Sequence, residues 1–202
     1  SSAFFIILTA LSKNSRLLIK DVNINPTRIG IISILKKMGA NIIFQNQKTY
    51  KGEKLADIKI EGGKKLKAIN CPANLNSGAI DEFLVIFLVA AKAKGISYFK
   101  DLAELNQKES PRLIWGAKIL NMMGVNIIFQ NQKTYKGEKL ADIKIEGGKK
   151  LKAINCPTNL NSEAIDEFLV IFLVAAKAKG ISYFKDLAEL NQKESPRLKW
   201  GA

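Results

Sequence analysis

The chain of 202 residues contains no histidine. This absence excludes serine or cysteine nucleophiles activated by histidine, and it excludes metal sites built on imidazole. Any acid–base catalysis within the chain must therefore use aspartate, glutamate, lysine, tyrosine or cysteine. Cysteine is also scarce, because Cys71 and Cys156 are the only two, which is too little sulfur for a disulfide scaffold or a zinc site. We expect each to be a small buried residue of a protein in the reducing cytoplasm.

Long apolar runs and glycine-rich phosphate loops are missing as well. The longest apolar stretches, such as residues 83–91, span about nine residues, whereas a membrane-spanning helix needs about 20. No secretory leader is visible after Ser1, and neither a Walker loop nor a dinucleotide-binding loop is present. The sequence therefore predicts a globular protein without a membrane segment.

Positive charge is abundant, and it is spread along the chain. Thirty-two lysines and arginines oppose 18 acids, which gives a net charge of +14. This excess fits a polyanion-binding surface, a pocket for a small multiply charged anion, or a lysine-rich solvated surface. Aromatic residues are not interleaved with a basic stripe, and we expect Trp115 and Trp200 to be packing residues. Nucleic acid is therefore the less favoured partner.

The chain repeats itself, since residues 41–117 return as residues 126–202 with a shift of 85. Three positions differ between the copies: Ala73 against Thr158, Gly78 against Glu163, and Ile114 against Lys199. A Lys-Asp pair recurs at residues 20–21, 100–101 and 185–186. These repeats predict a partial diverged unit over residues 1–40, a first long repeat over 41–125 and a second over 126–202.

Two kinds of helix are expected. Asn25-Pro26, Ser110-Pro111 and Ser195-Pro196 each place a capping side chain before a proline, which predicts helices over residues 27–38 and 112–123. Gly39 and Gly124 follow these two helices. Residues 4–11, 80–91 and 165–176 are apolar nearly all round, so we expect these helices to be buried.

Strands are expected between these helices. Residues 57–61 alternate polar and apolar side chains, which is typical of a sheet with one face in water. Residues 41–44, 65–69 and 96–99 are further candidates, with turns at 50–53 and 62–63. Buried helices combined with strands that have one face in water predict an α/β fold with helices inside and sheets outside.

Two clusters of charged residues are candidate sites. Asp81 and Glu82 open an apolar helix, either to complement its dipole or to aim a carboxylate into a cleft. Lys108, Glu109 and Arg112 crowd the start of the next helix, where a cation opposes the helix dipole. That cluster is either an anion site or an ordinary surface ion pair.

Five ordered motifs resemble one family. They are Ser-Ser-Ala-Phe-Phe at 1–5, Asn-Pro-Thr-Arg at 25–28, Met-Gly-Ala at 38–40, Ala-Ile-Asp-Glu-Phe at 79–83 and Lys-Glu-Ser-x-Arg at 108–112. Residues 1 to about 125 resemble the later half of 5-enolpyruvylshikimate-3-phosphate synthase (EPSP synthase), particularly its glyphosate-insensitive bacterial branch. The resemblance implies an inside-out, barrel-like fold of βαβαββ units. It also implies transfer of the enolpyruvyl group of phosphoenolpyruvate to shikimate 3-phosphate, with no metal or organic cofactor.

The resemblance also implies roles for four residues. Asp81 would contact shikimate 3-phosphate and help to remove its hydroxyl proton, while Glu109 would shuttle protons to and from the enolpyruvyl methylene. Lys108 would bind near the reacting groups, and Arg112 would hold the phosphoenolpyruvate anion. The duplicate set lies where the family has no such site and consists of Asp166, Lys193, Glu194 and Arg197.

The chain also departs from the family pattern. The family's first half is absent, a His-Arg pair is missing, and Pro111 stands where the motif usually has aspartate. We therefore expect an EPSP-synthase-like protein of the shikimate pathway that is incomplete and inactive alone. Alternatively, the chain would be a noncatalytic repeat scaffold that self-associates, or a protein that binds polyanions. If it is part of the enzyme, a complementing N-terminal half is a further expected partner. The Lys-Glu-Ser-x-Arg motif disfavours the related UDP-N-acetylglucosamine enolpyruvyl transferase.

Overall fold

The structure is a computed structural model that describes residues 2–102, 112–135, 138–163 and 167–187. The chain forms two compact units. The first contains Ser1–Lys100 and Ile145–Gly148, and the second contains Asp101–Lys144 and Lys149–Ala202. In the part of the chain that is described, no helix is long and apolar enough to cross a membrane. The repeat-based division at residues 40 and 125 stays a prediction.

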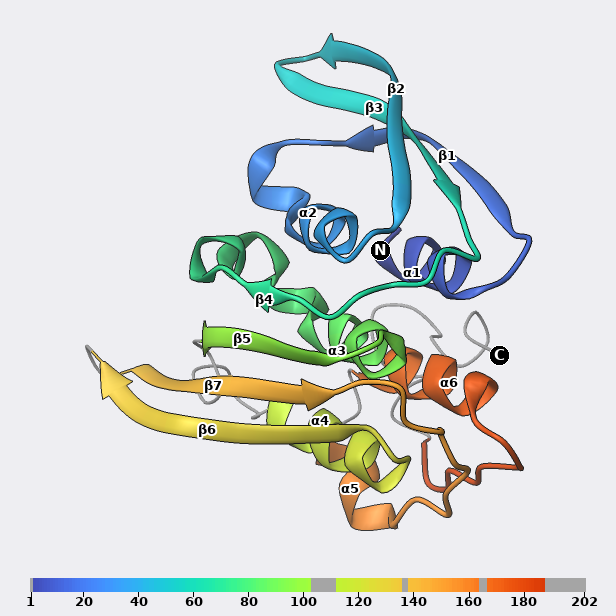
Figure 1. The fold of residues 1–202 in the computed structure, drawn as a ribbon, viewed down its shortest axis with the longest axis vertical. Coiled ribbons are helices and arrows are strands. Elements are labelled where there is room, and N and C mark those ends of the chain that lie inside the picture. The colour runs from blue at the N-terminus through green and yellow to red at the C-terminus, as the bar shows by residue number, and fades with distance from the viewer. Residues whose placement is uncertain (1, 103–111, 136–137, 164–166, 188–202) are drawn as a thin grey trace. The chain divides into compact units, whose positions relative to one another are not determined.

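The first unit alternates helices with strands. Its elements are α1 (Ala3–Leu11), β1 (Arg16–Asn23), η1 (Pro26–Arg28), α2 (Gly30–Lys37), β2 (Asn41–Tyr50), β3 (Glu53–Glu61), β4 (Asn70–Cys71), η2 (Ala73–Leu75), η3 (Ser77–Glu82), α3 (Phe83–Lys92) and β5 (Ile96–Leu102). The last two residues of β5 belong to the second unit. Strands β1, β3 and β2 form an antiparallel sheet in that order. Helices α1 and α2 lie against one face of this sheet (Figure 1).

Helix α3 forms the centre of the first unit. Every residue from Phe83 to Ala91 is buried. The rings of Phe83, Phe87 and Phe99 pack together with centroids 5.5 to 5.9 Å apart. Helix α1 contacts both α3 and β3. The predicted inside-out α/β fold, with a buried helix and outer strands, is therefore confirmed.

The sheet of the first unit is irregular beside Asp57. Both neighbouring strands shift register there, and Asp21 and Asn46 adopt positive φ angles of 53° and 48°. The backbone N–H of Asp21 and the side-chain amide of Asn46 donate hydrogen bonds to the Asp57 carboxylate. Asp57 is only 8% exposed. The prediction that the polar residues of 57–61 all face water is therefore wrong at Asp57, because hydrogen-bond donors replace water around its carboxylate.

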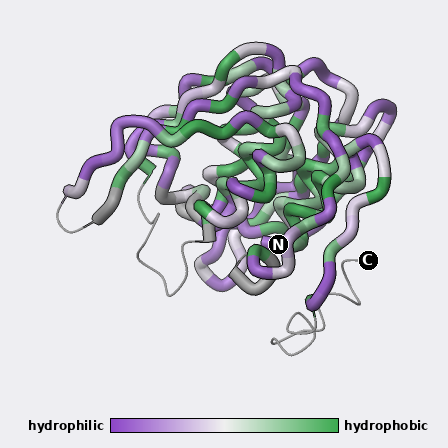
Figure 2. The backbone as a smooth tube through the Cα atoms, turned by 90° about the horizontal axis from the view of Figure 1, so that it is seen from below, coloured by the Kyte–Doolittle hydropathy of each residue, from purple (hydrophilic) through white to green (hydrophobic). Residues whose placement is uncertain are grey.

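The second unit repeats this pattern in part. Its elements are α4 (Arg112–Met122), β6 (Asn126–Tyr135), β7 (Glu138–Glu146), α5 (Thr158–Glu163) and α6 (Phe168–Lys177). The end of β7 belongs to the first unit. Strands β6 and β7 are neighbours and form a hairpin, toward whose end hydrophilic residues predominate (Figure 2). Helix α4 packs against α5 and α6.

The helix predicted over residues 27–38 is divided in two. A 3₁₀ turn, η1, precedes α2, which begins at Gly30. Asn25 does not cap the turn with its side chain. Instead its amide donates to the Glu53 carboxylate, and its side-chain oxygen accepts the N–H of Lys54. The capping prediction is wrong at Asn25 because this side chain joins β3, and the two Ser-Pro caps lie outside the described residues.

The strand predicted over residues 65–69 is also wrong. Lys67 forms only an isolated parallel bridge with Lys94, and the ordered strand β4 begins at Asn70. The Ile69 N–H donates to the side-chain oxygen of Ser97. The ladder is interrupted because a side chain takes the place of a backbone acceptor.

Other predictions are confirmed by the structure. Helix α1 covers residues 4–11, although Phe5 is 62% exposed, so this helix is not buried all round. Gly39 and Gly124 follow α2 and α4, each with φ of +93°, a conformation that favours glycine. Cys71 and Cys156 are buried free thiols.

Candidate functional site

The candidate site of the first unit is centred on η3, the turn before α3. Helix α3 begins at Phe83, so Asp81 and Glu82 precede it instead of forming its first turn. Glu82 lies at the N-cap position but makes no side-chain capping hydrogen bond. The Asp81 side chain is exposed, while Glu82 is half-buried. One carboxyl group therefore faces solvent beside a second that is partly withdrawn from it.

Two glycines allow η3 to approach η1 and α2 closely. A Cβ atom on Gly30 would lie 2.3 Å from the carbonyl carbon of Gly78. No real Cβ atom tolerates that distance to a backbone atom. The turns η1 and η3 are in contact as a result. This packing brings the Asn-Pro-Thr-Arg segment, which ends in the exposed Arg28, beside the segment that contains Asp81.

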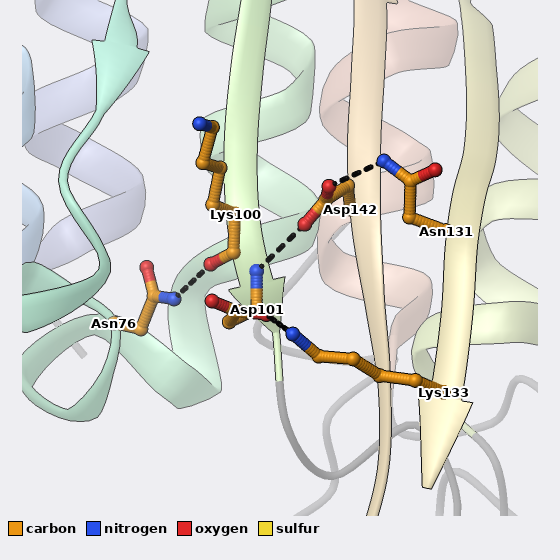
Figure 3. A network of polar contacts seen from close by, with 6 residues as sticks. All are labelled: Asn76, Lys100, Asp101, Asn131, Lys133 and Asp142. Carbon is orange, nitrogen blue, oxygen red and sulfur yellow. Dashed lines mark hydrogen bonds and ion pairs between the residues drawn. The ribbon is translucent and has the colours of Figure 1, made fainter.

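A buried asparagine connects η3 to β5. Asn76 is 7% exposed, and its side-chain amide donates to the backbone carbonyl of Lys100 over 2.7 Å (Figure 3). A hydrogen bond of this kind fixes the residue that leads into η3. The turn is therefore held from two sides, by α2 through glycine and by β5 through Asn76.

The electrostatics of the two carboxyl groups differ. Burial raises the pKa of Glu82, and the negative charge of the neighbouring Asp81 raises it further. Glu82 consequently keeps its proton to a higher pH than an exposed glutamate does. Two adjacent carboxyl groups in unlike environments are suited to proton transfer, because the exposed one can accept a proton while the partly buried one holds its proton more strongly.

Most of the predicted site residues lie outside the described part of the chain. They are Lys108, Glu109, Asp166, Lys193, Glu194 and Arg197. Arg112 begins helix α4, as expected, and its side chain is outside the description. Asp81 is therefore the one predicted site residue whose side chain the structure describes. The predictions missed Arg28 as a site residue, although the Asn-Pro-Thr-Arg motif was the available signal.

The described ranges contain no cluster of side chains that could bind a metal ion. Within residues 2–102, 112–135, 138–163 and 167–187, no group of three or more cysteine, aspartate or glutamate side chains is arranged to hold an ion. The expectation that no cofactor is needed stays a prediction.

Comparison with known proteins gives one consistent family. The sequence model of the family described as EPSP synthase (3-phosphoshikimate 1-carboxyvinyltransferase) matches residues 1–149. A 3-phosphoshikimate 1-carboxyvinyltransferase from Ruthia magnifica subsp. Calyptogena magnifica is 44% identical over 149 residues, which are 73% of this chain and 32% of that protein. The enzyme of the same name from Legionella pneumophila strain Paris is 46% identical over 128 residues, or 62% of this chain and 29% of that protein. The chain thus spans about a third of the length of these curated relatives.

Solved structures agree with the sequence relatives. The EPSP synthase from Acinetobacter baumannii superposes with a TM-score of 0.76 at 30% identity, covering 100% of this chain and 44% of that one. The enolpyruvyl transferase NikO from Streptomyces tendae gives a TM-score of 0.61 at 13% identity, covering 98% of this chain and 40% of that one. The latter likeness shows the fold alone.

Proposed function

The chain belongs to the EPSP synthase family, and we propose that its first unit carries part of a site for enolpyruvyl transfer from phosphoenolpyruvate to shikimate 3-phosphate. The observation that supports this most is the packing of η1 against η3. It joins two motifs that are 50 residues apart in sequence, Asn-Pro-Thr-Arg and Ala-Ile-Asp-Glu-Phe. Both contain charged side chains that suit a phosphorylated, hydroxylated substrate.

Asp81 is the proposed contact of the reacting hydroxyl group. Its carboxylate is exposed at the end of the turn, so it is accessible to a ligand in solution. Proton removal makes the hydroxyl oxygen a better nucleophile toward the enolpyruvyl carbon. In this proposal the adjacent Glu82, whose pKa is raised by burial, would exchange the proton that Asp81 accepts.

The remaining roles follow the family motif at residues 108–112. Lys108 and Arg112 would bind the anionic substrates, and Glu109 would exchange protons with the methylene group. Cations also stabilise the charge that develops when phosphate leaves. The net charge of +14 is favourable for two polyanionic substrates.

We also propose that these 202 residues alone do not complete the reaction. They cover about a third of the curated relatives, so much of the relatives' length has no counterpart in the match. The working protein would then obtain the rest of the site from a complementing N-terminal half in the cytoplasm.

The duplication provides a matched control for the test. Titration of the purified chain with shikimate 3-phosphate should show binding that Asp81→Asn weakens by about 10-fold to 100-fold, the effect of losing one charged hydrogen bond. The same change in the second copy, Asp166→Asn, should leave the affinity unchanged. Equal effects of the two variants, or the absence of any binding by the unaltered chain, would contradict the proposal. Phosphate release from both substrates at a normal turnover rate would contradict the claim of incompleteness.

A further inference from the structure

Exposed lysines gather at one end of the first unit. None of them has an ion-pair partner within the described ranges. They come from the last turn of α2, from the segment between β3 and β4, and from the end of α3 with the residues that follow it. This set, which we call the lysine surface, consists of Lys36, Lys37, Lys65, Lys67, Lys92 and Lys94.

Contacts bring the three segments of the lysine surface together. The N–H of Lys67 donates to the carbonyl of Met38, the residue that follows α2, over 2.9 Å. Lys67 and Lys94 stand opposite each other in a parallel bridge. Burial raises the pKa of the Cys71 thiol to about 11, and Lys37 lies close enough for its charge to oppose that shift. The lysines are therefore neighbours in space, although α2 and α3 are far apart in the sequence.

Buried side chains fix the backbone that carries these lysines. In the segment before β4 and in the segment after α3, a buried residue separates two exposed lysines. Leu66 is 7% exposed and Ala93 is 0% exposed. The lysine backbones cannot move apart without bringing these apolar residues into water, which is unfavourable.

Stability explains only part of this arrangement. Lys36, Lys37 and Lys92 lie in the last turns of α2 and α3, where a cation complements the helix dipole. Lys67 and Lys94 have no such role, and like charges directly opposite each other on paired strands are destabilising. Residues that break a local rule of stability are typical of functional sites.

The acids of the first unit do not pair with this surface. The half-buried Glu146 belongs to the same unit and precedes Gly147, whose N–H donates to the carbonyl of Gly95. Within the described ranges it forms no ion pair with any of the six lysines. Asp81 lies before the opposite end of α3, whose ten residues span about 15 Å. The lysine surface is therefore separate from the candidate site.

The second copy of the repeat lacks two of the six lysines. With the shift of 85, Asn121 stands at the place of Lys36, and Met122 stands at the place of Lys37. Both residues belong to α4, which ends at Met122. The helix of the repeat therefore accommodates asparagine and methionine at these two positions.

The residue types of the surface favour phosphate as its ligand. All six cations are lysines, and lysine binds phosphate as a point charge. Arginine, which has the planar fork that pairs with a carboxylate through two hydrogen bonds, is absent from the set. We propose that the lysine surface binds a linear chain of phosphates. This proposal does not depend on the proposed enolpyruvyl transfer.

Binding of fluorescent inorganic polyphosphate to the full chain tests the proposal at several salt concentrations. Lys36→Asn combined with Lys37→Met should weaken binding about 10-fold at low salt, because two exposed ion pairs are lost. The slope of log affinity against log salt concentration should become shallower by about 2. The affinity of this variant for shikimate 3-phosphate should stay unchanged, since Asp81 lies at the other end of α3.

Lys51→Asn combined with Lys54→Met is the matched control. It removes the same two charges from the exposed tip of the β2–β3 hairpin. The ten-residue strand β2, about 30 Å long, lies between α2 and that tip, and exposed charges are screened over about 10 Å at 0.1 M salt. We expect the affinity of the control for polyphosphate to stay within about twofold of that of the unaltered chain.

Two competitors identify the source of the phosphates. Competition by a DNA duplex would assign them to a nucleic acid, and its failure to compete would assign them to free polyphosphate; the proposal holds in either case. No binding of polyphosphate at low salt would overturn the proposal. Equal weakening in the control variant would also overturn it, because net charge alone would then explain binding. So would polyglutamate that binds as tightly and depends equally on Lys36 and Lys37, since this would assign the surface to an acidic polypeptide.

Discussion

Replacement of Gly30 by alanine tests the packing on which the candidate site depends. The new Cβ atom would lie 2.3 Å from the carbonyl carbon of Gly78, 2.4 Å from its oxygen and 2.7 Å from the nitrogen of Ala79. All three are backbone atoms, so no side chain can rotate out of the way. Relief requires η3 to move away from the start of α2.

The size of the effect follows from two opposing contributions. Overpacking of a well-packed site costs about 1–3 kcal/mol. Alanine is favoured over glycine in a helix by up to about 1 kcal/mol, and this gain is smaller at the first residue of α2 than in its interior. We therefore expect Gly30→Ala to lower the free energy of unfolding by about 1–2 kcal/mol.

Urea denaturation followed by far-ultraviolet circular dichroism measures this change, and Gly78→Ala is the matched control. A Cβ atom on Gly78 would lie 3.4 Å from the nearest backbone atoms, Gly30 Cα and Pro26 O, which is close to ordinary contact. We expect a change of less than about 0.5 kcal/mol for that variant, as for substitutions without a packing clash. Shikimate 3-phosphate affinity should fall in Gly30→Ala and hold in Gly78→Ala. Equal stability and equal affinity of Gly30→Ala and the unaltered chain would refute the reasoning.

Three further predictions concern titratable groups. Hydrogen bonds from Asn46 and then from the Asp21 N–H lower the pKa of Asp57. The ionised Asp57 therefore stabilises the fold above the pKa of the unfolded state, 3.8, and this stabilisation is lost as the pH falls, so the stability of Asp57→Asn should depend less on pH in acid. Burial raises the pKa of Glu82, so stability should fall as the pH rises above about 4.5, and Glu82→Gln should flatten that slope in pH-dependent urea titrations. Burial raises the pKa of the Cys71 thiol to about 11 and raises that of Cys156, so a thiol reagent at pH 8 should label neither in the folded chain and both in denaturant; rapid labelling of the folded protein would contradict the described burial.

The sequence was sufficient to predict the fold class and the buried helix α3, whereas the same prediction was wrong for parts of α1 and α6. The segment Phe83–Lys92 is apolar on all sides, and such a helix is stable only when neighbouring elements cover it. Alternation in residues 57–61 correctly indicated a strand. Local patterns of this kind are reliable when the burial of each residue depends on its own polarity.

The failures involve long-range partners. Asn25 has the chemistry of a helix cap, but β3 offers it Glu53 and Lys54 instead. The alternating pattern predicts that Asp57 faces solvent, but bulges in the two neighbouring strands bring the Asp21 N–H and the Asn46 amide to its carboxylate. No local pattern reports such partners, because they come from residues 11 to 36 positions away in the chain.

Even identical sequences do not fix burial. Residues 83–92 and 168–177 are the same, yet every residue from Phe83 to Ala91 is buried, whereas only four residues of α6 are. An identical local sequence therefore does not determine how much of a helix its neighbours cover.

The duplication also supports the proposal that the first copy of the site, and not the second, binds substrate. With the shift of 85, Trp115 stands at the place of Gly30, and Glu163 stands at the place of Gly78. Both members of the glycine contact are therefore replaced in the second copy, and helix α5 covers the residues that correspond to η2 and to the first two residues of η3. Glutamate favours a helix over glycine by nearly 1 kcal/mol, so this substitution suits α5. The close approach that holds η3 against η1 belongs to the first copy, and this is the physical reason to expect substrate binding to depend on Asp81 and not on Asp166.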